Sequence, residues 1–214
     1  MIISPGRGYI FVHIPKTGGT SLALALEARA HRDDILIGDT PKAVRRRGRL
    51  KGLTPRGRLW KHSSLADIDG ILTPDEIAGM LCFCLVRNPW DRMVSYYHWL
   101  RDQSFDHPAV RIAQAHDFAD FVSDGFTRAT IRAWPYARYM QDVTGQSHAP
   151  LFLRLEHLEQ DMEPLIAHLG FAPEMPHINR SDRGADYRAY YSDETRQIVA
   201  AICAKDIARF GYVF

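Results

Sequence analysis

A short glycine turn near the start of the chain combines several groups that bind anions. Residues 15–21 read Pro-Lys-Thr-Gly-Gly-Thr-Ser. The preceding residues 9–14 have the β-branched and aromatic composition of a buried strand, and an Ala- and Leu-rich helix follows to about residue 30. In a turn between a strand and a helix, backbone N–H groups point into a concavity, with the positive end of the helix dipole behind them. The turn is therefore predicted to bind a phosphate or a similar anion.

The order of residues in this turn differs from that of the nucleotide-triphosphate loop. In that loop the lysine follows the last glycine and directly precedes a metal-binding hydroxyl. Here Lys16 precedes both Gly18 and Gly19, and the next buried strand, residues 80–86, is followed by Arg87 rather than by an aspartate that could hold Mg²⁺. The pattern favours a phosphate site that needs no metal. An ordinary strand-to-helix turn with a capped helix is the alternative.

A second candidate site follows the strand at residues 80–86. Arg87 stands at the carboxyl end of this strand, where open α/β sheets bind their ligands, and Ser95 lies on the helix that comes next. A fixed guanidinium and a nearby hydroxyl can together hold a phosphate dianion. Arg92 is expected to pair with an aspartate, Asp91 or Asp102, rather than to contact a ligand.

The elements that must position these residues alternate along the chain. Strands are predicted at residues 9–14, 80–86 and 151–155, with a short fourth strand at 35–37. Helices are expected to start near residues 20, 74 and 89, with further helical stretches at 118–122, 131–140, 157–168 and 193–210. Strands that alternate with helices indicate an α/β fold with a mainly parallel sheet. The length of 214 residues fits one domain spanning residues 1–214.

The charge pattern is more informative than the net charge of +2, which does not suggest a nucleic-acid partner. No acidic residue lies between Asp39 and Asp67, and the Gly- and Pro-containing part around residues 42–58 is predicted to be a basic loop insertion. Such a run is usually a solvated segment, and the alternative is an electropositive rim that draws an anionic ligand toward a site. The basic residues are Lys42, Arg45, Arg46, Arg47, Arg49, Lys51, Arg56, Arg58 and Lys61.

Cysteines and hydropathy indicate the cellular setting. Three cysteines do not make a disulfide framework in a chain of this length, and Cys82 and Cys84 are expected to be buried thiols in a strand. The first residues lack the basic start and apolar core of a signal peptide, and no stretch is long and apolar enough for a membrane span. We therefore expect reduced, cytoplasmic chemistry and no integral membrane segment.

Both candidate sites resemble one known family. Residues 11–21 resemble the 5′-phosphosulfate loop of the sulfotransferases that use 3′-phosphoadenosine 5′-phosphosulfate (PAPS), in particular the group with the heparan and chondroitin O-sulfotransferases and many small bacterial proteins. Residues 86–97 are similar to the 3′-phosphate segment of that group, including the spacing from arginine to serine, and residues 179–214 resemble its tail. The resemblance spans essentially the full chain. It implies a three-layer α/β/α sandwich related to the P-loop NTPases.

The resemblance also implies roles for individual residues. Lys16 would stabilise charge on the leaving oxygen in addition to binding the donor, and no metal is required. His62, in the run Lys-His-Ser-Ser, falls where this group places the base that activates the acceptor; apart from the resemblance it would be read as a surface histidine, and Glu156 is a second candidate for the base. The donor-binding residues implied are Lys16, Thr17, Gly18, Gly19, Thr20 and Ser21 for the 5′-phosphosulfate, and Arg87, Ser95, Arg180 and Ser181 for the 3′-phosphate.

The predicted activity is direct in-line transfer of a sulfuryl group from PAPS to a hydroxyl, or an amine, of an acceptor. A glycan or a small metabolite is expected as the acceptor, in a bacterial cytoplasm, and the basic run favours an anionic one. Two other functions stay open: a nucleotide phosphotransferase or NTPase on a related fold, and a non-catalytic nucleotide-binding relative.

Overall fold

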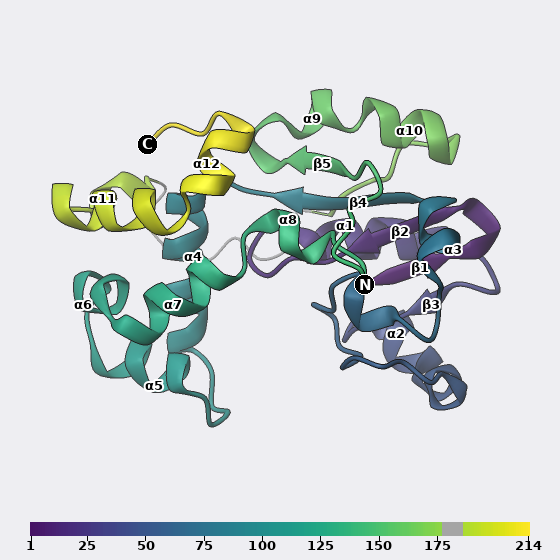
Figure 1. Ribbon diagram of the computed structural model, residues 1–214, viewed down its shortest axis with the longest axis horizontal. Helices are drawn as coiled ribbons and strands as arrows, with labels where there is room; N and C mark the ends of the chain where they lie inside the picture. Colours follow the sequence, from purple (N-terminus) through teal and green to yellow (C-terminus); the bar gives the residue numbers. More distant parts are fainter. Residues whose placement is uncertain (177–185) are drawn as a thin grey trace. The chain divides into compact units, whose positions relative to one another are not determined.

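The computed structural model describes residues 1–176 and 186–214 of the chain (Figure 1). This described chain divides into two compact units. The first unit comprises Met1–Val86 and the stretch from Tyr136 to residue 176, and the second comprises Arg87–Pro135 and residues 186–214. No helix within the described ranges is long and apolar enough to cross a membrane.

A five-stranded sheet forms the centre of the first unit, with the strand order β3-β1-β2-β4-β5. β2 pairs with β4 and β4 with β5 in parallel, whereas β1 is antiparallel to both of its neighbours. All strands except β1 therefore run in one direction, which confirms the predicted α/β fold with a mainly parallel sheet. The sequence pattern missed β1, because three residues are too few to show a period. The strands are β1 (Ile2–Ser4), β2 (Tyr9–Val12), β3 (Ile35–Leu36), β4 (Leu81–Val86) and β5 (Leu151–Arg154).

Both faces of this sheet are buried. Phe11 and Phe83 lie opposite each other in the register of β2 and β4, and they share one hydrophobic cluster with Leu22 of α1 (Gly19–Ala28) and Leu165 of α10 (Glu163–Leu169). Side chains alternate across a strand, so the neighbouring residues point to the other face, and Val12 and Cys84 are fully buried there. Strands buried on both faces explain the continuous apolar runs in the sequence.

The basic segment departs from the prediction of a loop around residues 42–58. Its first part is a helix, α2 (Pro41–Arg46), followed by the 3₁₀ segment η2 (Arg47–Gly52). The side chain of Thr40 caps α2 by accepting from the backbone N–H of Ala43, at 3.2 Å, and the Ala43 side chain is buried. Threonine and proline at a helix start are strong signals, and here they outweigh the glycines and prolines further on.

Helical segments complete the first unit. The short helix α3 begins where the Thr-Pro-Asp-Glu sequence predicted a helix start, and a capping box between Thr73 and Glu76 closes its N-terminus. The helix predicted at residues 157–168 is divided at Met162, two residues before the proline in the first turn of α10. The segments are η1 (Pro5–Arg7), η3 (Ala66–Ile68), α3 (Pro74–Ala78), α8 (Tyr136–Tyr139), η4 (Leu155–His157) and α9 (Leu158–Asp161).

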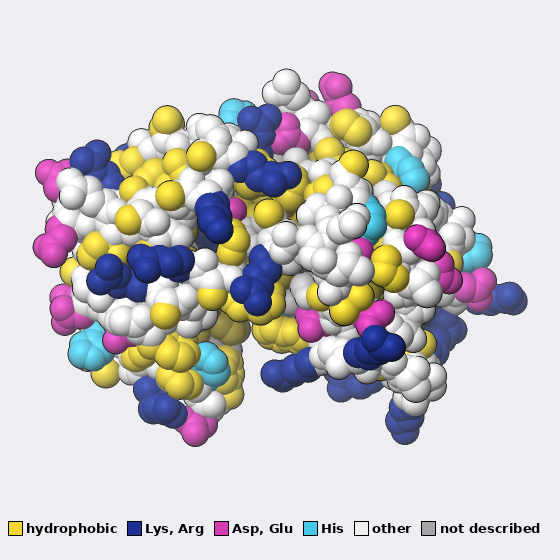
Figure 2. All heavy atoms as spheres, in the orientation of Figure 1, with side chains coloured by type: hydrophobic (Ala, Val, Ile, Leu, Met, Phe, Trp, Pro, Cys, Tyr) yellow, Lys and Arg dark blue, Asp and Glu magenta, His cyan; other side chains and the backbone are white. Residues whose placement is uncertain are grey.

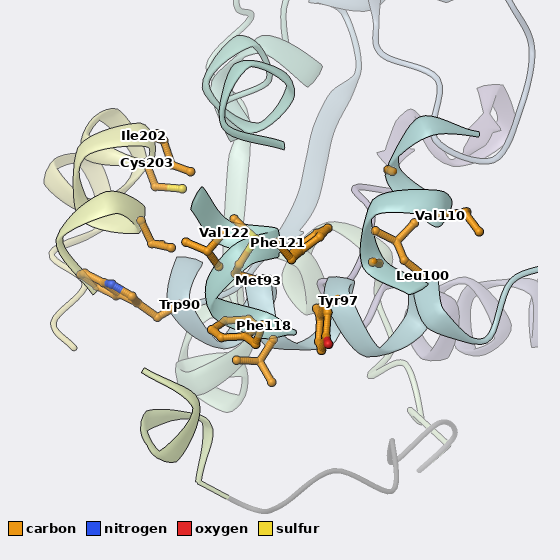
Figure 3. Packing of buried hydrophobic residues seen from close by; sticks show 14 of the residues in the cluster. Trp90, Met93, Tyr97, Leu100, Val110, Phe118, Phe121, Val122, Ile202 and Cys203 are labelled. Atoms are coloured by element: carbon orange, nitrogen blue, oxygen red, sulfur yellow. The ribbon is translucent and has the colours of Figure 1, made fainter. Parts of the chain in front are cut away.

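Helices make up the second unit, around a core of aromatic and aliphatic side chains (Figure 3). Met93 and Tyr97 of α4 pack in this core with Phe121 of α6. The helix predicted at 131–140 is interrupted after Ala133, because the residue before a proline avoids the helical conformation. The elements are α4 (Pro89–Arg101), α5 (Pro108–Ala115), α6 (Phe118–Ser123), α7 (Gly125–Ala133), η5 (Tyr187–Tyr190), α11 (Asp193–Ile202) and α12 (Ala204–Phe210).

Candidate active site

The turn between β2 and α1 has an unusual backbone. Gly18 adopts a left-handed conformation, with a φ of 85°, and so does Lys16, with a φ of 64°. For a residue with a side chain this conformation is unfavourable by about 1–2 kcal/mol. Strained residues of this kind gather at functional sites, where the surrounding structure holds them in place. The sequence explained only the glycine, since the left-handed conformation of a lysine leaves no mark in its pattern.

Gly19 is required for a different reason than Gly18. Its φ lies outside the left-handed region, but a Cβ added to it would stand only 2.2 Å from Cδ2 of His13. The His13 ring, at the end of β2, is therefore packed directly against the backbone at the start of α1. Close packing, rather than an unusual backbone conformation, is therefore what excludes a side chain at Gly19.

The hydroxyl groups of the turn differ in burial and in hydrogen bonding. Thr17 is fully buried, and its hydroxyl donates to the carbonyl oxygen of Ile14 at 2.9 Å, so this group closes the turn from within. Thr20 is half-buried, and the backbone N–H of Ser21 donates to the carbonyl oxygen of Gly18 at 3.2 Å. Gly18 occupies the N-cap position of α1, where no side chain caps the helix within the described structure. The first backbone N–H groups of α1 are thus available to an anion.

His62 lies beside this turn through its contact with His13. Nδ1 of His62 is 2.7 Å from the carbonyl oxygen of His13, and the two rings meet edge to face with their centroids 4.7 Å apart. The Trp60 ring contacts the other side of His62, at a centroid distance of 5.0 Å. A carbonyl oxygen only accepts hydrogen bonds, so a neutral His62 carries its proton on Nδ1 and its lone pair on Nε2. This is the tautomer in which Nε2 can take a proton.

The surroundings keep His62 neutral. Burial lowers the pKa of His62 to about 3, and the positive charge of Lys61 acts in the same direction, while the hydrogen bond to the His13 carbonyl partly opposes both. Burial is the larger of the two causes, and Asp39 offsets some of the lysine charge through an ion pair with Lys61 at 2.6 Å. The pKa of His13 is also well below its ordinary value, because this ring is buried.

The two serines after His62 have structural roles. Ser63 is fully buried, and its hydroxyl can donate its one proton to the carbonyl oxygen of Arg58, at 2.8 Å, or of Trp60, at 2.9 Å. Ser64 donates through both its backbone N–H and its hydroxyl to the carboxylate of Asp67, at 2.7 and 2.8 Å. The serines therefore hold the turn that presents His62.

The segment after β4 belongs to the second unit and is built around an ion pair. Nε and Nη2 of Arg87 lie 2.7 and 2.6 Å from Oδ2 of Asp91, and both side chains are mostly buried. The structure pairs Asp91 with Arg87, and the expected pairing of Arg92 with Asp91 or Asp102 stays a prediction. Arginine and aspartate four residues apart face each other on a helix surface, so the spacing itself could have revealed the pair. The pair orients the guanidinium of Arg87 at the start of α4.

Ser95 and Asn88 complete the segment. Asn88 caps α4 by accepting from the backbone N–H of Trp90 at 3.1 Å, and its amide donates to the carbonyl oxygen of Val213 at 2.8 Å. Ser95 is buried in the second turn of α4, and within the described chain its hydroxyl has no hydrogen bond. The second unit thus offers an oriented guanidinium directly before α4 and a serine hydroxyl on this helix.

Other predicted residues are placed as follows. Glu156 is exposed on η4, and its neighbour Leu155 packs against the turn, since Cδ1 of Leu155 is 3.2 Å from where a Cβ on Gly18 would lie. Arg180 and Ser181 lie outside the described residues. Among the residues that are described, no cluster of three or more His, Cys, Asp or Glu side chains could hold a metal ion.

The three cysteines are buried and free, as expected for Cys82 and Cys84. Burial raises the pKa of the Cys82 thiol to about 11, which makes this thiol a poor nucleophile at neutral pH. The thiols therefore contribute to packing.

Comparisons with known proteins agree with this picture. A family model described as the sulfotransferase family matches residues 1–213. No curated protein matches the chain. Among solved structures, the chain is similar to a mouse sulfotransferase complexed with PAP, with a TM-score of 0.55 and 15% identity over 98% of this chain and 87% of that chain. At this identity the similarity supports the fold. The predicted resemblance to PAPS-dependent sulfotransferases is confirmed at the level of family and enzyme class: this chain belongs to the sulfotransferase family.

Proposed function

We propose that this enzyme transfers the sulfuryl group of PAPS to a hydroxyl, or an amine, of a glycan or a small metabolite. The observation that carries the proposal is the turn after β2. Lys16 and Gly18 of this turn both adopt a left-handed backbone conformation. The helix that follows has no side-chain cap at its N-terminus in the described structure. An arrangement of this kind suits the 5′-phosphosulfate, since backbone N–H groups and a helix dipole favour an anion.

The 3′-phosphate is what distinguishes PAPS from ATP, and we assign it to the segment after β4. Arg87 is oriented by Asp91, and the Ser95 hydroxyl is available for a hydrogen bond. Arginine binds phosphate through two parallel N–H bonds, which gives both affinity and direction. The similar solved structure is complexed with PAP, the nucleotide that remains after sulfuryl transfer, which supports a donor with a 3′-phosphate.

In the proposed reaction, Nε2 of His62 accepts the proton of the acceptor hydroxyl as the acceptor oxygen attacks sulfur. The bond between sulfur and the bridging oxygen of the 5′-phosphate breaks, and the charge that grows on this oxygen is stabilised by Lys16 and by the backbone N–H groups of the turn. The tautomer of His62, which leaves the lone pair on Nε2, supports its role as a base, and its low pKa keeps the ring neutral at pH 7. Positioning and charge stabilisation account for most of the acceleration, as in phosphoryl transfer.

A thermal-shift experiment tests the donor assignment. Adenosine 3′,5′-bisphosphate should raise the Tm of the protein much more than ATP with Mg²⁺ does, since at equal concentration the ligand that binds the folded state more tightly stabilises it more. Adenosine 5′-monophosphate serves as the matched control without a 3′-phosphate. A larger shift with ATP and Mg²⁺ would favour a nucleotide phosphotransferase instead. Mass spectrometry of cell extract supplied with PAPS and enzyme would then identify acceptors by the added sulfate.

A further inference from the structure

The basic segment between Asp39 and Asp67 keeps most of its positive charge in the folded chain. Of its basic residues, Arg56 pairs with Asp69 at 3.1 Å and Lys61 with Asp39 at 2.6 Å. The remaining basic residues of the segment form no ion pair within the described ranges. Dark blue side chains gather accordingly over α2 and the segment that follows it, at the lower right of Figure 2. The proposed transfer reaction uses none of this charge except the pair at Lys61.

A cavity of about 430 Å³ opens within this basic surface. It lies between β3, with the turn that precedes β3, and the residues at the end of α2 and in η2, all in the first unit. The lining includes the charged residues Arg32, Arg46, Arg49, Asp33 and Asp34. We call it the arginine cavity. It has no residue in common with the turn at residues 15–21 or with His62.

Two of its arginines are held in place by the main chain. Nη1 of Arg46 donates to the carbonyl oxygen of His31 at 2.9 Å, and Nη1 of Arg49 donates to that of Arg32 at 2.6 Å. A carbonyl oxygen fixes a guanidinium without neutralising its charge. Each arginine has five N–H donors, so most of them remain for a ligand. The cavity therefore presents two pre-oriented cations.

Carboxylates also line the cavity and narrow the choice of ligand. Asp33 accepts from Nε of Arg32 at 3.3 Å. Asp34 is buried, and while its Oδ2 accepts from the backbone N–H of His31 at 2.7 Å, its Oδ1 has no hydrogen-bond partner in the described structure. Acceptors among the arginines suit a ligand that brings hydroxyl donors as well as an anionic group.

From this arrangement we propose that the arginine cavity binds an acidic saccharide, a sugar unit that carries a carboxylate, sulfate or phosphate group. The anionic group would contact the guanidinium groups of Arg46 and Arg49, and sugar hydroxyls would donate to acceptors such as the Asp33 carboxylate. The volume accommodates more than a single inorganic ion. The site does not depend on the proposed sulfuryl transfer.

A membrane surface fits these observations less well than a saccharide does. Helices that lie on membranes bury an extended apolar face, and α2 has only six residues, with Ala43 already buried inside the protein. A concave site with carboxylates in its lining also suits neither a flat anionic bilayer nor a densely charged nucleic acid. The experiment must therefore distinguish binding of an acidic saccharide from binding to anionic lipid.

Calorimetry at low ionic strength tests the proposal with a trimer of galacturonic acid and with its neutral methyl ester. The unmodified protein should bind the acid and not the ester. The variant R46Q/R49Q should bind the acid at least about tenfold more weakly, since one charged hydrogen bond contributes about a decade in Kd. The matched control R45Q/R47Q removes the same charge from the same segment, at exposed residues outside the lining of the cavity. Its affinity for the acid should fall by less than about threefold.

Several results would overturn the proposal. Equal losses of affinity for the trimer in the two double variants would indicate diffuse electrostatic attraction rather than a specific site. Binding of inorganic phosphate or sulfate without binding of the trimer would exclude a saccharide as the ligand of the cavity. Binding to phosphatidylserine vesicles, but not to the trimer, would make the surface a membrane contact. Should R46Q/R49Q fail to fold, as judged by its Tm, R46K/R49K keeps the charge but loses the planar donor fork, and it should still weaken binding of the trimer relative to R45Q/R47Q.

Discussion

The two segments that we assign to the donor are built from different chemical groups. After β2, the turn offers backbone N–H groups, and its side chains serve mainly to shape it: Thr17 closes the turn, and the His13 ring packs against Gly19. After β4, the ligand groups are side chains: Arg87 lies just before the N-cap of α4, and Ser95 lies on this helix. The first segment should therefore be sensitive to changes in backbone shape, and the second to changes in charge.

Replacing His62, which lies beside the first segment, is expected to have the largest effect on turnover. His62→Ala should reduce kcat by about 10²–10⁴, the usual contribution of a general base, while adenosine 3′,5′-bisphosphate binds with nearly unchanged affinity. His62→Asn is the informative control, because its amide can still donate to the His13 carbonyl but cannot accept a proton at neutral pH. Steady-state kinetics with any identified acceptor measures both. Normal turnover in His62→Asn would transfer the role of base to Glu156.

Replacing Lys16 separates the charge in the turn from its shape. Lys16→Ala should lower kcat by about 10²–10³, the effect of losing one group that stabilises transition-state charge, with a much smaller loss of nucleotide affinity. Lys16→Gly should lower kcat equally while stabilising the protein, since glycine adopts the left-handed conformation without strain. Kinetics and thermal unfolding give the two readouts. If Lys16→Ala keeps full turnover, the assigned role of this lysine is wrong.

Adding a methyl group at Gly19 tests the packing that shapes the turn. Gly19→Ala should lower the free energy of unfolding by about 1–3 kcal/mol, because its Cβ would overlap the His13 ring. Gly48→Ala is the matched control, as no atom lies within 4 Å of the added Cβ there. The double variant with His13→Ala should recover much of the stability lost in Gly19→Ala. Denaturant unfolding measures all of these variants, and an absence of coupling between the two sites would contradict the contact.

The burial of His62 predicts a smaller effect, which is a dependence of the free energy of unfolding on pH. His62 has a pKa of about 3 in the folded protein and near 6.5 in an unfolded chain. Between these values the unfolded chain binds more protons, so stability is complete above about pH 6.5 and falls as the pH decreases below it. From pH 7 to pH 5 the loss due to His62 should be about 1–2 kcal/mol. His62→Gln should lose correspondingly less stability over this interval, and an identical loss in both proteins would contradict the low pKa.

The sequence was sufficient to predict the framework and both segments. Strands β2, β4 and β5 follow from their continuous apolar runs, and the glycine turn and Arg87 stand where strands end, so their places in the fold could be foreseen. The short β1 could not, and α2 was missed although Thr40 and Pro41 mark its start, because the glycines and prolines that follow favoured a loop. Local patterns report strand and helix periods well when an element is long, and poorly when it has only a few residues.

Contacts between distant residues account for what the sequence analysis missed at the site. The hydrogen bond from His62 to the His13 carbonyl joins residues 49 positions apart, and the packing of His13 against Gly19 depends on how β2 meets α1. Neither contact has a signature in spacing or composition. The pair of Arg87 and Asp91 is local, however, and its spacing of four residues was available to be recognised.

The central claim is that this chain recognises a nucleotide by its 3′-phosphate through Arg87, and calorimetry with two nucleotides tests it directly. Arg87→Ala should weaken binding of adenosine 3′,5′-bisphosphate by about 1.5–3 kcal/mol, the contribution of a hydrogen bond to a charged group, and leave adenosine 5′-monophosphate almost unaffected. Asp91→Asn, which removes the ion pair but keeps the guanidinium, should retain most of the preference for the bisphosphate. Equal losses for both nucleotides in Arg87→Ala would contradict the assignment of Arg87 to the 3′-phosphate.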